Sequence, residues 1–221
     1  MGSEKNSHLH MIRVWTKAKR FYTLFLNTFF KFSGARDALY RLSLEGLTKL
    51  EKAEWPAKQD KISLCITKGQ SEKDCRNFVK VLVSHQDQLL ACGTYSFSPK
   101  CSWRPIEAIR QVTEYVDGRG KCPYNPRANS SAYMNSQGDY YIASSTDFSA
   151  NDHAIYKMSG WPKLQQNLMR TVQYNYEWLS QTNFGMFHYI SRWLKTKNQI
   201  SVFWFVLVLQ SKKRRGQIKV L

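Results

Sequence analysis

Two pairs of cysteines that enclose short, turn-rich loops constrain the fold of this chain most. Cys65 and Cys75 flank a Lys-Gly-Gln-Ser segment, and Cys92 and Cys101 enclose a Gly-Thr strand end followed by a Ser-Pro turn. Such loops are typical of extracellular β proteins stapled by disulfides and are rare in cytosolic enzymes. We therefore expect the bonds Cys65–Cys75 and Cys92–Cys101, which leave Cys122 unpaired. Nested pairing is the alternative, and the short loops favour the nearest partners.

The net charge of +17 is concentrated in the two ends of the chain. Residues 1–32 contain six Lys/Arg and one Glu, and residues 189–221 contain eight Lys/Arg and no acidic residue. Residues 33–188 contain 19 basic and 15 acidic residues, which is an ordinary mixed-charge surface. A protein that binds nucleic acid usually carries a basic patch on its folded body. We therefore expect no nucleic-acid binding by the body of this chain.

The first apolar run, residues 21–32, allows two interpretations. With the basic segment 13–20 before it, the run resembles a secretory signal. Asn27 and Lys31 interrupt the run, however, so a first β-strand is the favoured interpretation. Because residues 1–20 carry charge without an apolar face to bury, we expect them to be poorly ordered.

The second apolar run, residues 200–209, lies in the basic C-terminal tail. As a helix it would span only about 15 Å, half of a bilayer core, so it does not predict a convincing membrane anchor. A solvated Lys-Lys-Arg-Arg cluster follows at 212–215, and residues 211–221 are expected to be poorly ordered.

Short strand-like segments separated by turn residues fill the body and predict an all-β fold. Helical periodicity is visible only in pieces, for instance around residues 44–50. Hairpin turns are expected near Gln86 and Gly138, and glycine suits the positive φ that the second turn requires. The expected strands are 39–44, 78–83, 89–92, 132–134, 140–143, 154–157 and 171–174.

A weak internal repeat refines this prediction. Small residues close an apolar strand at Gly34, at Gly93 and at Ala143, with spacings near those of propeller blades. A sandwich is the alternative that this pattern leaves open. For a propeller, the side chains of Leu90, Cys92, Tyr141 and Ala143 are expected to be well packed.

Ordered segments over residues 34–184 resemble the sema domain of the semaphorin family. The Cys92-Gly93-Thr94 segment with Cys101 resembles its Cys-Gly-Thr signature, and residues 120–126 resemble its Gly-Lys-Cys-Pro corner. Residues 101–104 and the sequon at Asn129 are most similar to class 5 semaphorins of invertebrates. Further similar segments are 34–42, which resembles an opening blade strand, 75–82, 147–156 and 170–179.

This resemblance implies an incomplete β-propeller, the first blades of a seven-bladed ring, in an extracellular or cell-surface guidance ligand. A plexin-type receptor is the implied partner, and homodimers are implied for full-length members. Three segments are expected: a basic and apolar N-terminal segment at 1–33, a partial sema domain at 34–184, and a basic tail at 185–221 without family similarity. Ala143 and Ala150 stand where the family usually has glycine, which is tolerable where φ is negative.

No sequence pattern supports an enzyme, a cofactor or a metal site. The five cysteines lack the Cys-x-x-Cys spacing of zinc sites, and the histidines form no metal-binding motif. A dinucleotide loop, a Walker motif and a nucleophile elbow are also missing from the sequence. The sequence thus predicts a binding protein, with no catalytic, cofactor-binding or metal-binding residues.

Two other classes of function remain open. One is a basic intracellular protein that binds nucleic acid or anionic membrane through its termini. The other is a non-functional truncated product of a longer semaphorin gene. An N-glycan at Asn129, in the Asn-Ser-Ser sequon, and oxidised cysteine pairs would favour the extracellular class.

Overall fold

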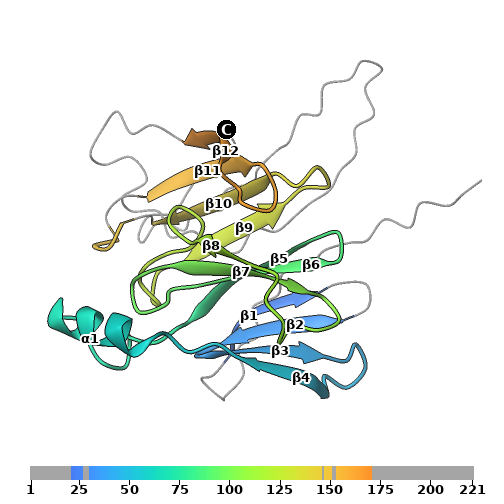
Figure 1. Cartoon of the computed structure of the whole chain (residues 1–221), viewed down its shortest axis with the longest axis horizontal. Coiled ribbons are helices and arrows are strands. Elements are labelled where there is room, and N and C mark those ends of the chain that lie inside the picture. The colour runs from blue at the N-terminus through green and yellow to red at the C-terminus, as the bar shows by residue number, and fades with distance from the viewer. Residues whose placement is uncertain (1–20, 27–29, 146, 151–152, 171–221) are drawn as a thin grey trace, which may run out of the picture.

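The computed structural model describes residues 21–26, 30–145, 147–150 and 153–170 (Figure 1). Within these ranges, twelve strands form three four-stranded antiparallel sheets. The first sheet contains β1 (Phe21–Leu26), β2 (Lys31–Ala35), β3 (Ala38–Leu42) and β4 (Lys49–Glu54). The helix α1 (Gln59–Thr67) leads to the second sheet, with β5 (Val79–His85), β6 (Gln88–Gly93), β7 (Lys100–Pro105) and β8 (Glu114–Asp117). The third sheet contains β9 (Ser130–Met134), β10 (Tyr140–Ser145), β11 (His153–Ser159) and β12 (Gln166–Arg170).

The three sheets are arranged as successive blades. In each sheet the strands follow one another in chain order, and Figure 1 shows the sheets stacked from β1–β4 through β5–β8 to β9–β12. The first strand of the second sheet, β5, lies against β1 and β2 on one side and against β9 on the other. The first strand of each sheet is therefore innermost and the fourth strand is outermost. After the outermost strand of one sheet, the chain passes to the innermost strand of the next sheet. This is the topology of a β-propeller, so the all-β, propeller-type prediction is confirmed.

The second sheet is buried on both faces because it lies between the other two. Along β6, Leu89 and Ala91 belong to the apolar cluster shared with the first sheet, while Leu90 and Cys92 belong to the cluster shared with the third. Side chains that alternate along a strand point to opposite faces. A strand covered on both faces therefore reads as a continuous apolar run, as β5 and β6 do.

Most expected strands of the body are present. The predicted hairpins are β5–β6, with Gln86 at φ +54°, and β9–β10, with Gly138 at φ +84°. The strand interpretation of the first apolar run agrees with β1 and β2. The strand expected at 171–174 and the expectations for 1–20 and 185–221 lie outside the described residues.

The three small residues of the internal repeat occupy equivalent strands of the three sheets. Gly34, Gly93 and Ala143 lie on β2, β6 and β10, which are the second strands of the three sheets. At Gly34 a β-carbon would lie 2.7 Å from Cγ1 of Val79 on the next sheet. The small residue there lets two blades approach closely.

The helix expected around residues 44–50 was wrong. Residues 44–48 lie in the turn between β3 and β4, and residues 49 and 50 are the first residues of β4. Thr48 N–H donates to Ser43 Oγ at 3.1 Å, and Ser43 N–H donates to the Thr48 carbonyl at 2.9 Å. Gly46 and Leu47 have φ of +67° and +54°, which a right-handed helix does not allow.

The helix of the structure, α1, was not predicted. Ile62, Leu64 and Ile66 alternate with a period of two, which hides the helical pattern in the sequence. In the structure, Ile62 and Cys65 are the buried residues of this helix, one turn apart. Their burial against the first and second sheets decides the conformation of this segment.

Two further expectations needed correction. Residues 34–42 are not one strand, because a turn at Arg36 and Asp37 separates β2 from β3, with Asp37 at φ +59°. Of the four residues expected to be well packed, only Tyr141 is partly exposed; Tyr140 is fully buried instead. Tyr140 points into the cluster shared with the second sheet, and Tyr141 points to the opposite face.

The expected boundary between residues 33 and 34 falls inside β2. The last residues of segment 1–33 thus form part of the first sheet, because β2 pairs with both β1 and β3.

Candidate interaction site

The Cys-Gly-Thr segment forms a tightly bonded corner between the first and second sheets. Asn77 is fully buried beside Gly93; its Nδ2 donates to the Trp55 carbonyl at 2.8 Å, and its Oδ1 accepts from Tyr95 N–H at 3.1 Å. A β-carbon at Gly93 would lie 2.1 Å from Asn77 Oδ1. The glycine of the signature is therefore required by the amide that packs against it.

The threonine of the signature satisfies buried backbone groups. Thr94 Oγ1 donates to the Arg76 carbonyl at 3.2 Å and accepts from Phe78 N–H at 3.1 Å. Asp37 extends this network into the first sheet, because its carboxylate accepts from Asn77 N–H at 2.9 Å. Buried polar groups are costly unless they are bonded, so this network fixes how the two sheets meet.

The corner continues into a left-handed turn. Tyr95, Ser96 and Phe97 have φ values of +44°, +58° and +55°, and all three are buried. Each non-glycine residue in this region costs about 1–2 kcal/mol. The turn is held by the hydrogen bonds from Tyr95 N–H to Asn77 and from Ser96 N–H to the Arg76 carbonyl.

The structure joins the cysteine pairs named by the sequence. Cys65 on α1 is bonded to Cys75, with their Cα atoms 5.8 Å apart. Cys92 and Cys101 lie opposite each other on β6 and β7 and are bonded, with a Cα separation of 4.0 Å. Formation of these bonds in the expressed protein stays a prediction. Cys122 is a buried free thiol, and burial raises its pKa far above the ordinary value.

The Gly-Lys-Cys-Pro corner is attached to the second and third sheets by hydrogen bonds. Lys80 Nζ, on β5, donates to the Pro126 carbonyl at 2.9 Å. Tyr140 Oη, on β10, donates to the Lys121 carbonyl at 2.7 Å. The corner therefore connects two neighbouring sheets.

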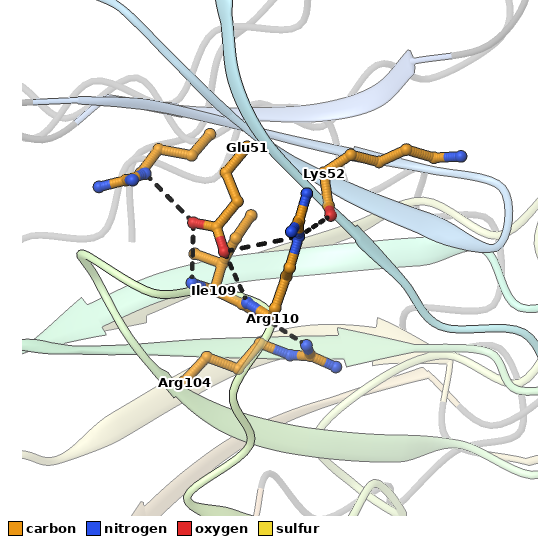
Figure 2. A network of polar contacts seen from close by, with 6 residues as sticks. Glu51, Lys52, Arg104, Ile109 and Arg110 are labelled. Carbon is orange, nitrogen blue, oxygen red and sulfur yellow. Dashed lines mark hydrogen bonds and ion pairs between the residues drawn. The ribbon is translucent and has the colours of Figure 1, made fainter.

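Glu51 forms a second contact between the first two sheets (Figure 2). From β4 it accepts hydrogen bonds from the backbone N–H groups of Ile109 and Arg110, both at 3.1 Å. It also pairs with Arg41 at 3.4 Å. The buried Arg104 donates to the Ile109 carbonyl at 2.6 Å and so holds the same loop from the other side.

Sequence reasoning did not identify Glu51 or Ile109, because their contact joins two different sheets. Arg104 lay within the segment 101–104, but its bond to Ile109 was not foreseen. Asn77 was visible within the segment 75–82, although its partner Trp55 was not.

Two further positions named by the sequence are in loops. Asn129 is partly exposed and lies immediately before β9, and its glycosylation stays a prediction. Ala150 has φ of +58°, so the expected tolerance for alanine, which required a negative φ, does not hold there. Ala143 lies within β10 and is not among the residues with positive φ.

Within the described ranges, no three His, Cys, Asp or Glu side chains are grouped closely enough to hold a metal ion. In the same part of the chain, no helix has the length and apolar character to cross a bilayer. The described part of the chain offers packed blades, hydrogen-bonded corners and outer strand edges that no other described strand pairs with.

Comparison with curated proteins finds semaphorins. Over 152 residues the chain is 45% identical to Semaphorin 5c of Drosophila melanogaster. The matched region covers 68% of this chain and 14% of that protein. It is 41% identical to Semaphorin-5B of Mus musculus over 164 residues, covering 71% of this chain and 14% of that protein. The chain thus matches about one seventh of the length of these relatives. No family model matches the chain.

Solved structures agree with these relatives. The extracellular domains 1–2 of Drosophila Semaphorin 1b superpose with a TM-score of 0.65 at 32% identity, over 78% of this chain and 32% of theirs. Drosophila Semaphorin 2a gives a TM-score of 0.68 at 26% identity, over 78% and 32%. A chain from the complex of Drosophila Plexin A with Semaphorin 1b gives 0.63 at 34% identity, over 75% and 30%.

The three blades, with their innermost strands in contact, define part of a β-propeller. The sequence similarity then gives the family: the chain belongs to the semaphorins and contains part of a sema domain.

Proposed function

We propose that this chain is part of an extracellular guidance ligand of semaphorin type that binds a plexin-type receptor. The observation that carries the proposal is its similarity, at 34% identity, to a chain of the Plexin A–Semaphorin 1b complex. The chain acts as a binding module and not as an enzyme. Its place is extracellular or at the cell surface, as the description of Semaphorin 1b as extracellular domains supports.

The partial sema domain is proposed to extend over residues 34–184, as the family similarity suggests, with β1 and the start of β2 completing its first sheet. A receptor surface built from several blades would use more of the ring than these three sheets. The experiment therefore measures receptor binding by the chain alone and by a chimera in which the chain forms part of a complete propeller.

The test uses the full 221-residue chain, secreted from insect cells and immobilised, with the ectodomain of Drosophila Plexin A in solution. A second sample replaces the matching segment of Drosophila Semaphorin 1b, which is found in complex with Plexin A, with residues 34–184. We expect saturable receptor binding by the chimera, and weaker binding by the isolated chain. The heat-denatured chain is the control.

Failure of a secreted and folded chimera to bind plexin, beside a parent semaphorin that binds, would overturn the proposal. Binding of the chain to heparin or to anionic vesicles that disappears in 0.5 M salt, without receptor binding, would favour the alternative of a basic protein acting through its termini.

The secreted chain also tests the expected modifications. Non-reducing peptide mapping should recover Cys65 linked to Cys75 and Cys92 linked to Cys101. Digestion with peptide N-glycosidase should remove mass from the peptide containing Asn129. Free thiols at the four paired positions, or a nested pairing, would contradict the extracellular disulfide framework.

A further inference from the structure

The outermost strand of the first sheet, β4, has one edge that no strand in the described part of the chain pairs with. Trp55 N–H donates to the Asp37 carbonyl at 2.9 Å and continues the β3–β4 ladder. Hydrogen-bonded pairs alternate along an antiparallel ladder, so the backbone groups of Lys52 and Glu54 point away from β3. The Lys52 carbonyl shows this directly, because it accepts from Arg110 Nε at 2.9 Å.

A groove runs along this edge. It has a volume of about 460 Å³ and is lined by residues 49–54 of β4 together with Arg110. Leu50 contributes an apolar wall, with 49% of its surface exposed.

The charges around the groove favour an anionic occupant. The two carboxylates are already paired: Glu51 with Arg41 and two backbone N–H groups, and Glu54 with Lys52 Nζ at 2.8 Å. Lys49 forms no ion pair with any described residue. Arg110 Nε pairs with Glu51 Oε1 at 4.0 Å, at the long end of ion-pair distances, and the Arg110 side chain is 71% exposed.

We propose that β4 binds an extended acidic segment of a protein partner by strand addition. The backbone of the segment would bond to the outward groups of Lys52 and Glu54, and its carboxylates would pair with Lys49 and Arg110. Arg110 moves its guanidinium from the Lys52 carbonyl to the bound acid, so one hydrogen bond replaces another.

This proposal does not depend on plexin binding, because it concerns one strand edge. The probe is an octapeptide that alternates Glu with Thr, blocked at both ends, and the control probe replaces every Glu with Lys. Binding to the full chain is measured by calorimetry at 50 mM and 300 mM salt. We expect the Glu peptide to bind at low salt, at least tenfold more weakly at high salt, and the Lys peptide not to bind.

Matched variants locate the site. Lys49→Glu combined with Arg110→Ala should weaken binding of the Glu peptide at least tenfold. The contact between the sheets is kept, because the backbone N–H of residue 110 still donates to Glu51. Lys73→Glu combined with Lys163→Ala makes the same change of three charges at exposed positions outside the groove, and it should leave binding within twofold. Hydrogen exchange at the Lys52 and Glu54 amides should slow when the peptide binds, since strand addition requires backbone bonds.

Three results would overturn the proposal. One is absence of binding at low salt, and another is an equal loss of affinity in the groove and Lys73 variants, which would indicate diffuse attraction. The third is protection of the Lys52 amide that rises with protein concentration without peptide, together with dimers in light scattering. That result would assign the edge to a second copy of the chain.

Discussion

Replacing Gly93 with alanine tests whether the Cys-Gly-Thr corner holds the first two sheets together. The new β-carbon would lie 2.1 Å from Asn77 Oδ1 and 3.0 Å from its Cγ, so the amide must move. Movement breaks the bonds from Asn77 Nδ2 to the Trp55 carbonyl and from Tyr95 N–H to Asn77 Oδ1. Each buried group left without a partner costs about 1–3 kcal/mol, so the substitution should cost about 4 kcal/mol.

That loss is a large part of the stability of an ordinary domain, about 5–15 kcal/mol. The assay is urea unfolding of the secreted full chain, followed by tryptophan fluorescence, for wild type, Gly93→Ala, Asn77→Ala and the double variant. Because Asn77→Ala removes the obstructing amide, the added cost of Gly93→Ala should fall below about 1 kcal/mol in that background.

The control is Gly69→Ala, where a β-carbon meets no described atom within 4 Å but φ is +83°. Only the backbone penalty applies there, about 1 kcal/mol. The reasoning fails if Gly93→Ala costs no more than this control. It fails equally if the cost is the same with and without the Asn77 side chain.

Glu51→Ala should destabilise the chain by about 3 kcal/mol in the same urea assay, because it strips a nearly buried carboxylate from two backbone donors and Arg41. A loss under 1 kcal/mol would show that this contact does not stabilise the blade boundary. Ala150→Gly should stabilise by about 1 kcal/mol by relieving a positive φ, whereas Ala143→Gly within β10 should destabilise by a similar amount; equal signs would contradict the backbone argument. The pKa of Asp139 is lowered chiefly by the hydrogen bond that Ser159 Oγ donates to its carboxylate at 2.6 Å. The ionised Asp139 therefore stabilises the fold at neutral pH, and this stabilisation is lost as the pH falls through the lowered pKa. Asp139→Asn should therefore reduce the loss of stability between about pH 5 and pH 2 in acid titrations, and an unchanged titration would refute this.

Local features were predictable because a few neighbouring residues encode them. The β5–β6 and β9–β10 hairpins follow from apolar runs separated by turn residues, and the cysteine pairs from short loop lengths. The repeat of small residues marked one strand in each sheet, and the structure shows that these are the second strands. Where a local pattern was misleading, as at residues 44–50 and in α1, left-handed turn residues and burial of Ile62 and Cys65 decided the conformation.

The sequence by itself thus determined the all-β class, two hairpins and the family, through ordered motifs such as Cys92-Gly93-Thr94. Only the tertiary structure showed why that glycine is needed, that Glu51 caps a loop 58 residues away, and that β4 presents an open edge. The physical reason is the distance along the chain over which each interaction acts. A turn or a strand depends on steric and burial preferences over a few residues, whereas a buried hydrogen bond between blades exists only after the sheets have packed and excluded water.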